Sequence, residues 1–156
     1  MRLRVIAVGT RMPRWVREAF DDYAGRLSGG LKLSLVEIEA GARGAGRAVQ
    51  QAIDSEAKRI TAALRKNEFV VALDEHGAGL TTRELSTWLA DRMQGGRDVA
   101  FLIGGPDGLS APLLSRSEFQ WSLSPLTFPH ALVRVVLAEQ LYRAQTVLNN
   151  HPYHRD

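Results

Sequence analysis

The sequence has no cysteine among its 156 residues. Disulfide bonds, thiolate catalysis and cysteine-based zinc sites are therefore excluded. No apolar run approaches the roughly 20 consecutive residues that a membrane-spanning helix needs. The opening stretch MRLRVIAVGTRMP has too short an apolar run for a secretory signal peptide, and it lacks a small-residue cleavage site. We therefore expect a cytoplasmic protein with no membrane partner.

Common catalytic motifs are also absent. Neither a P-loop nor a G-x-G-x-x-G dinucleotide motif follows an expected strand, and no G-x-S-x-G nucleophile elbow occurs. Histidine is scarce, and no carboxylate motif accompanies its four copies, which are His76, His130, His151 and His154. We expect neither a bound metal nor Ser-His-Asp catalysis.

The composition suits a single domain covering residues 1–156, with 45% hydrophobic and 24% charged residues. A net charge of +3 favours polyanionic partners only mildly. The cations are nevertheless gathered early in the chain, because five arginines precede the first acidic residue, Glu18. Arg43 and Arg47 lie in a glycine-rich loop. An ordinary solvated surface is the alternative reading of this charge pattern. The five early arginines are Arg2, Arg4, Arg11, Arg14 and Arg17.

Hydrophobic periodicity predicts strands that alternate with helices. The expected strands cover 3–9, 31–39, 69–74, 98–104 and 119–124, and the expected helices cover 12–27, 48–66, 81–96 and 129–148. The third helix has a capping box, Thr81 followed by Glu84. This alternation indicates an α/β domain with a mostly parallel sheet flanked by helices. Ligands of such sheets bind beyond the carboxyl ends of the strands, here in the loops after Asp74, Ile103 and Trp121.

The predicted last helix, 129–148, is apolar around almost its whole circumference. Such a helix must be covered on several sides, and a second subunit is one source of cover. Glu139 and Arg143 form one of its few polar stripes. At i,i+4 spacing they are alternatively a simple surface pair.

Three segments could carry chemistry. FLIGGPDGLS places two glycines directly after a strand, where backbone can approach a ligand closely; a turn-rich strand exit is the alternative. WSLSPLTFPH offers backbone polar groups beside apolar side chains, which suits a flat heteroaromatic such as adenine, although an ordinary loop would read the same. NNHPYHRD carries two histidines, a tyrosine and an arginine where chain ends usually fray. We expect this last segment to be tied down against something that needs those groups.

Further segments of the sequence are LRVIAVGT, VALDEHG and LSPLTFPHALVRVVLAEQLYRAQ. In the order and spacing of all these segments, the chain closely resembles the RlmH family of 23S ribosomal RNA pseudouridine N3-methyltransferases, which are members of the SPOUT class. The resemblance covers essentially the whole chain. It implies an α/β fold with a C-terminal trefoil knot, S-adenosylmethionine as methyl donor with no metal, and a homodimer. It also implies 23S ribosomal RNA, in the assembled ribosome, as the substrate.

The resemblance also implies the site residues. Tyr153, His154 and Arg155 are expected to reach an active site formed across the dimer, with Glu139 and Tyr142 supporting the interface and the tail. Arg155 would stabilise the anion that develops on the pseudouridine imide, because a guanidinium stays protonated. His154 could accept the N3 proton, and Tyr153 could orient the base. The implied cofactor contacts are Leu73, Gly104, Leu123, Ser124, Pro125, Leu126, Thr127 and Phe128.

Two other functions remain open at this stage. A non-catalytic ribosome- or RNA-binding module with the same fold would bind RNA without a methyl donor. A small α/β enzyme acting on a nucleotide or another phosphorylated metabolite would work independently of RNA. In the RNA-linked readings, the arginine-rich start of the chain and the GARGAGR loop would contact phosphates without reading sequence.

Overall fold

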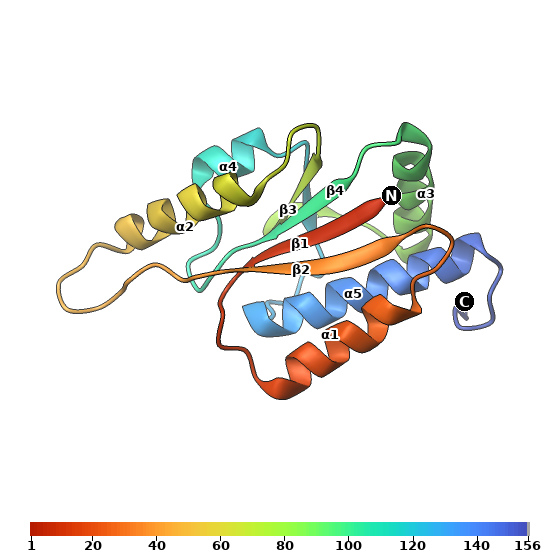
Figure 1. The fold of residues 1–156 in the computed structure, drawn as a ribbon, viewed down its shortest axis with the longest axis horizontal. Coiled ribbons are helices and arrows are strands. Elements are labelled where there is room, and N and C mark those ends of the chain that lie inside the picture. The colour runs from red at the N-terminus through yellow and green to blue at the C-terminus, as the bar shows by residue number, and fades with distance from the viewer. Residues whose placement is uncertain (156) are drawn as a thin grey trace.

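The computed structural model describes residues 1–155, which form a sheet between two layers of helices (Figure 1). Its elements are, in order, β1 (Arg2–Val8), α1 (Arg14–Arg26), β2 (Lys32–Ile38), α2 (Val49–Ala63), β3 (Phe69–Gly79), α3 (Thr82–Gly95), β4 (Val99–Ile103), α4 (Ala111–Arg116), β5 (Phe119–Ser122) and α5 (His130–Leu148). Strands and helices alternate throughout the described chain, as the hydrophobic pattern predicts.

The five strands lie in the order β2-β1-β4-β3-β5, and every neighbouring pair is parallel. The predicted mostly parallel α/β sheet is therefore confirmed. β1 and β4 are central, and both β4 and the stretch of β1 from Leu3 to Val8 are buried. Strands buried on both faces are typical of parallel sheets with helices above and below them.

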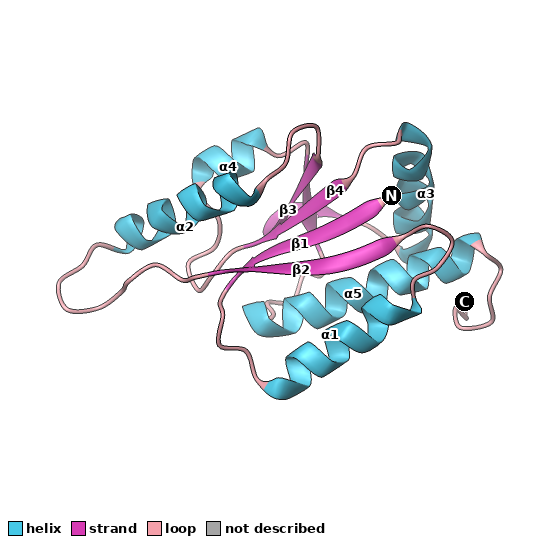
Figure 2. Cartoon of the chain, viewed as in Figure 1, coloured by secondary structure: helices cyan, strands magenta, loops and turns pink. Residues whose placement is uncertain are grey.

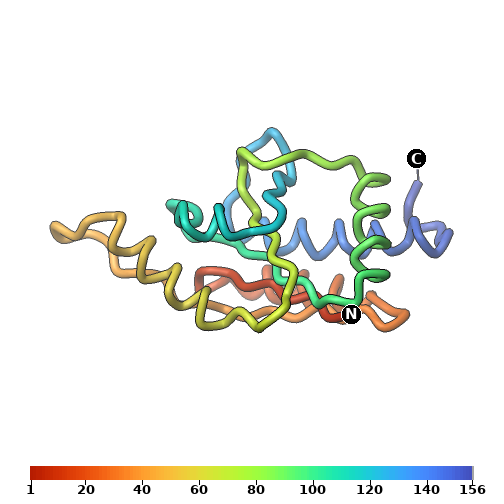
Figure 3. Tube along the Cα trace, turned by 90° about the horizontal axis from the view of Figure 1, so that it is seen from above, coloured from red at the N-terminus to blue at the C-terminus, as the bar shows by residue number. Residues whose placement is uncertain are grey.

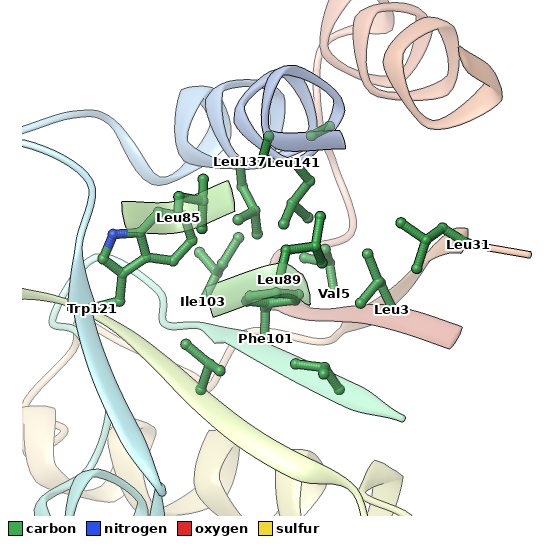
Figure 4. Close-up of a cluster of buried hydrophobic side chains, with 14 of the residues drawn as sticks. Leu3, Val5, Leu31, Leu85, Leu89, Phe101, Ile103, Trp121, Leu137 and Leu141 are labelled. Carbon is green, nitrogen blue, oxygen red and sulfur yellow. The ribbon is translucent and has the colours of Figure 1, made fainter. Parts of the chain in front are cut away.

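Alternate residues of each strand serve opposite faces of the sheet. Leu3 and Val5 of β1 and Phe101 of β4 pack beneath α3 and α5 on one face (Figure 4). Ile6 and Leu102 point to the other face. Figure 2 shows α1 and α5 side by side on the first face and α2 and α4 on the second. This layering follows from the period of two residues along a strand.

The predicted capping box is confirmed, because the Thr81 hydroxyl accepts from the Glu84 N–H at 3.2 Å and the Glu84 carboxylate accepts from the Thr81 N–H at 2.7 Å. The predicted end of the third strand at Asp74 is wrong, since β3 continues to Gly79. A register shift between Leu73 and Ala78 lets the strand resume its pairing with β5. A bulge of this kind leaves no signal in hydrophobic alternation.

Two further features of the structure differ from the prediction, namely one strand boundary and one additional helix. The fifth strand ends at Ser122, not at 124. The short helix α4 was not predicted, because six residues are too few to show helical periodicity. Its start is nonetheless encoded: the Ser110 hydroxyl accepts from the Leu113 N–H at 3.3 Å, and Pro112 lies in the first turn.

The segments that leave β3 and β5 meet at one edge of the domain (Figure 3). Strand order does not define how these segments thread, so the trefoil knot stays a prediction. Within residues 1–155, none of the helices has the length and apolar character needed to cross a membrane.

A fully buried arginine joins α5 to the sheet. Arg134, on the first half of α5, has no exposed surface. Its guanidinium donates to the carbonyls of Val8 and Gly9 at 3.2 and 2.7 Å and pairs with Glu37 at 2.8 Å. The start of α5 is thereby held at the carboxyl ends of β1 and β2.

Replacing Arg134 should destabilise the fold strongly. Arg134→Met leaves a carboxylate and two carbonyl oxygens without their donor, and losing one partner of a buried pair costs about 3 kcal/mol or more. Urea unfolding at fixed protein concentration measures the change. Arg14→Met is the matched control, because Arg14 and Glu18 form an exposed i,i+4 pair. Equal unfolding free energies for the two variants would contradict the role given to Arg134.

Candidate cofactor pocket and C-terminal tail

The main pocket lies at the carboxyl edge of the sheet, as the α/β rule predicts. Its volume is about 480 Å³, within the range of small-molecule sites. Its walls are the irregular part of β3 from Leu73 to His76, the segment after β4, and the end of β5 with the segment that follows it. The first turn of α5 closes one side through His130 and Val133. The three walls correspond to the three loops that the sequence pattern singled out.

The structure brings the predicted cofactor residues together. All but one line this pocket, namely Leu73, Gly104, Leu123, Ser124, Leu126, Thr127 and Phe128. The exception, Pro125, is an exposed member of the same segment. Residues that are far apart in sequence thus share one cavity.

The glycine-rich wall after β4 depends on the absence of side chains. A Cβ on Gly104 would lie 2.5 Å from the carbonyl carbon of Gly108, which is far too close. Gly108 has a φ of +76°, and its N–H donates to the Gly105 carbonyl at 3.0 Å. This tight turn explains why GGPDG needs glycine at both positions. All five residues of the turn, 104–108, line the cavity.

The opposite wall, residues 122–128, is shaped by its serines. The Ser122 hydroxyl donates to the Ser124 carbonyl at 3.0 Å, and the Ser124 hydroxyl accepts from the Leu126 N–H at 2.9 Å. These local bonds fix the backbone and leave apolar groups at the rim, where Leu126 is 70% exposed. Backbone polar groups beside apolar side chains are suited to contacts with a flat heteroaromatic ring.

The pocket also contains groups that the sequence reasoning did not select. Asp74, Glu75, Asp107 and His130 all line it. Their signal was available in the sequence, because Asp74 and Glu75 lie at the predicted end of the third strand, Asp107 lies in GGPDG and His130 lies at the start of the last helix. Burial lowers the pKa of His130, and the cations of Arg134 and Arg43 lower this pKa further. A neutral imidazole thus faces a cavity that carries three carboxylates.

The C-terminal tail is attached to the far end of α5 and curls back beside it (Figure 1). The Tyr153 hydroxyl donates to the Glu139 carboxylate at 2.9 Å, and its ring lies 4.6 Å from the ring of Tyr142. The Arg143 guanidinium lies 5.0 Å from the centre of the Tyr153 ring and donates to the same Glu139 oxygen. Glu139 and Tyr142 support the tail, as expected. The i,i+4 pair is therefore part of a tail-docking site and not a simple surface pair.

Tyr153 is held as a neutral hydrogen-bond donor. Burial raises its pKa to about 12, and the hydrogen bond to Glu139 adds to the effect. The ring is half-buried, His154 is half-buried and Arg155 is exposed. Tyr153 therefore anchors the tail, and the residues after it extend beyond the anchor.

The pocket and the docking site of the tail use different parts of α5. The pocket includes its first residues, His130 and Val133, whereas the Tyr153 hydroxyl bonds to Glu139 at the middle of the helix. At about 1.5 Å per residue, Glu139 lies about 14 Å along the helix from His130. Tyr153, His154 and Arg155 are thus brought together with each other but not with the cofactor residues of their own chain.

The middle of α5 is only partly covered. α1 and α3 pack along it, and the sheet buries Leu137 and Leu141. Leu132, Val135 and Val136 remain half-buried. One chain therefore supplies most, but not all, of the cover that this apolar helix needs.

No group of three or more histidine or acidic side chains within residues 1–155 is arranged to hold a metal ion. One of the predicted phosphate-binding arginines is structural. Arg4 is buried and pairs with Glu68 at 2.6 Å. Its position inside a strand, flanked by apolar residues, was the signal that should have separated it from the surface arginines.

Residues 1–154 match the family described as Predicted SPOUT methyltransferase. Two curated relatives, both called "Ribosomal RNA large subunit methyltransferase H", come from Alkalilimnicola ehrlichii, at 55% identity, and Xanthomonas axonopodis pv. citri, at 52%. Each alignment covers 99% of both chains.

Solved structures show the same fold at much lower identity. A probable methyltransferase from Bordetella pertussis matches with a TM-score of 0.57, at 17% identity over 92% of this chain and 95% of that one. A probable methylase family protein from Haemophilus influenzae gives 0.57 at 15% identity over 99% and 70% of the two chains. The chain therefore belongs to the SPOUT methyltransferases, in the family of the ribosomal RNA large subunit methyltransferases H.

Proposed function

We propose that this protein is an S-adenosylmethionine-dependent methyltransferase that methylates N3 of a pseudouridine in 23S ribosomal RNA. We further propose that it acts in the cytoplasm, as a homodimer, on assembled ribosomes. The observation that carries the proposal is the pocket, in which the predicted cofactor residues converge at the carboxyl edge of the sheet. The relatives that match over nearly their whole length are named for methylation of large-subunit ribosomal RNA.

The pocket fits the proposed methyl donor chemically. The glycine turn, whose closed shape excludes a Cβ on Gly104, forms one wall, and the 122–128 wall provides backbone polar groups and apolar contacts for adenine. Asp74, Glu75 and Asp107 supply negative charge, which suits a ligand with a sulfonium and an ammonium group. When bound, the donor supplies an electrophilic methyl group on sulfur.

The reaction needs alignment and the removal of one proton. The attacking nitrogen, the methyl carbon and the sulfur must lie in line, so holding both reactants rigidly supplies much of the catalysis. The N3–H of pseudouridine is a weak acid and must lose its proton as the nitrogen attacks. His154 is assigned as the base or as the residue that positions it, and Arg155 as the charge that stabilises the developing imide anion.

Tyr153 is assigned a positioning role and no part in proton transfer. Its hydroxyl already donates to Glu139, and its raised pKa keeps it protonated. By docking on α5, Tyr153 fixes the point from which His154 and Arg155 extend. Contact with the nucleobase is left to those two residues and to the exposed part of the tyrosine ring.

The docking of the tail supports an active site shared between two subunits. Tyr153, His154 and Arg155 are not among the residues that line the pocket of their own chain, and the Tyr153 anchor at Glu139 is about 14 Å along α5 from His130. We therefore assign these residues to the pocket of another chain. The half-buried strip at Leu132, Val135 and Val136 offers apolar surface for that partner. In a two-fold dimer the two contacts are equivalent, so the tail of each subunit would reach the pocket of its partner.

Exposed arginines of the first helix and of the loop before α2 are assigned to the binding of RNA phosphates. Arg11, Arg14 and Arg17 surround the start of α1, and Arg47 lies in the loop before α2. Contacts of this kind give salt-dependent affinity without reading sequence. Ribosome shape would then determine which nucleotide is presented.

Transfer of labelled methyl to ribosomes that lack the modification tests the activity. We expect label on N3 of one pseudouridine in 23S RNA, and joined ribosomes should be better substrates than free large subunits. Calorimetry should show S-adenosylmethionine binding by the protein alone. RNA binding without donor binding would instead establish the non-catalytic module, and methylation independent of RNA would establish the small-molecule enzyme.

Mixed dimers test the shared site. One chain ends at Pro152, and the other carries Thr127→Trp, which fills the pocket from an exposed position. Each variant alone should be inactive. A one-to-one mixture after subunit exchange should recover about a quarter of wild-type activity, because half of the dimers have one intact site. A mixture that stays inactive, with exchange demonstrated by tags, would show that the tail works within its own chain.

Ionisation of the tyrosines tests the tail anchor. The sequence has three tyrosines, and one should ionise late, near pH 12, in an ultraviolet titration. Because the folded-state pKa exceeds the unfolded value of about 10, the anchor stabilises the tail fully below that pH and is lost as pH rises through 12. Tyr153→Phe should remove the late step. Its persistence in that variant would assign the step to another tyrosine.

A further inference from the structure

One arginine links the loop before α2 to the glycine turn of the pocket. Arg43 Nε donates to the Asp107 carboxylate at 2.8 Å. Asp107 is the aspartate of GGPDG, and it lines the pocket. Arg43 was predicted only as one of two loop cations for RNA phosphates, a role that its contacts do not favour.

The other side of the Arg43 guanidinium is fixed to α2. Its Nη1 donates to Glu56 at 2.7 Å and to the Gly41 carbonyl at 3.1 Å, and Nη2 reaches the second Glu56 oxygen at 3.3 Å. Glu56 is almost fully buried and also accepts from the Gly41 N–H at 2.8 Å. Arg43 is therefore a fixed bridge and not a mobile surface cation.

The base of the loop is rigid, and this makes the bridge effective. A Cβ on Gly41 would lie 2.5 Å from the Ala52 carbonyl oxygen, so the loop backbone is pressed against α2. Glu56 also lies beneath the glycine turn, because a Cβ on Gly105 would be 3.4 Å from its carboxylate. One buried carboxylate thus supports both the arginine and the turn that the arginine holds.

We propose that Arg43 is a positioning residue, which holds the glycine turn 104–108 in its donor-binding shape through Asp107. The inference rests on the proposed function, since it assigns this turn to S-adenosylmethionine. Arg43 pairs with the Asp107 carboxylate but shares its single charge with Glu56, so Asp107 keeps part of its negative charge in the pocket beside Asp74 and Glu75. Arg47, four residues further along the loop, is exposed and remains available to RNA.

A double-mutant cycle tests the proposal by calorimetry with S-adenosylmethionine and no RNA. Asp107→Asn keeps the buried Arg43–Glu56 pair, and it should weaken donor binding about tenfold, as loss of one charge-assisted hydrogen bond does. Arg43→Ala should have a similar effect. The double variant should bind no more weakly than the worse single variant, because both changes release the same turn.

Two controls separate positioning from simpler effects. Arg47→Ala removes the same charge from the same loop and should leave donor affinity unchanged. If Arg43→Ala does not fold, because it strands Glu56, Arg43→Lys replaces it, since lysine retains a cation but cannot reach both carboxylates.

The outcomes are distinct. Additive losses in the cycle, or equal donor affinity for wild type, Arg43→Ala and Asp107→Asn, would overturn the positioning role. A loss with Arg47→Ala equal to that with Arg43→Ala would replace it with a general charge effect. Absence of donor binding by the wild-type protein would instead contradict the proposed function itself.

Discussion

The buried guanidinium of Arg134 is the interaction on which the rest of this structure depends. It joins α5 to the ends of β1 and β2 through two carbonyls and Glu37. Because this attachment is near the start of α5, it places His130 and Val133 in the wall of the pocket. The same attachment sets the direction in which the remaining turns of the helix run, and therefore where the tail emerges.

Beyond that point the chain reverses its direction. α5 leads away from the pocket, and the tail then turns back so that Tyr153 docks on Glu139 and Tyr142 in the middle of the helix. The pocket for a small ligand thus lies at the start of α5, and the imidazole and guanidinium that follow the Tyr153 anchor do not line it. In the proposed homodimer, a second copy of the chain would bring a tail to each pocket and would also cover the remaining apolar strip of α5.

The sequence predicted the alternation of strands and helices, the capping box at Thr81 and the three loops that form the pocket, because these depend on local periodicity and strand ends. It did not predict the extension of β3 past its bulge or the short α4, which depend on pairing and on only a few residues. The burial of Arg4 could have been predicted from its place inside an apolar strand, but its partner Glu68 could not. The role of Arg43 was not predictable, because it depends on the positions of Glu56 and Asp107, which are distant in the sequence.

The absence of cysteine permits a direct measurement of the central claim, that the tail of one chain serves the pocket of the other. A variant with two substitutions, Leu126→Cys and Arg155→Cys, is prepared in isotopically heavy and light forms. The two forms exchange subunits, and the cysteines are then cross-linked. We predict cross-linked peptides of mixed mass, because residue 155 of one subunit meets residue 126 of its partner. Cross-links containing only heavy or only light peptides would contradict the account.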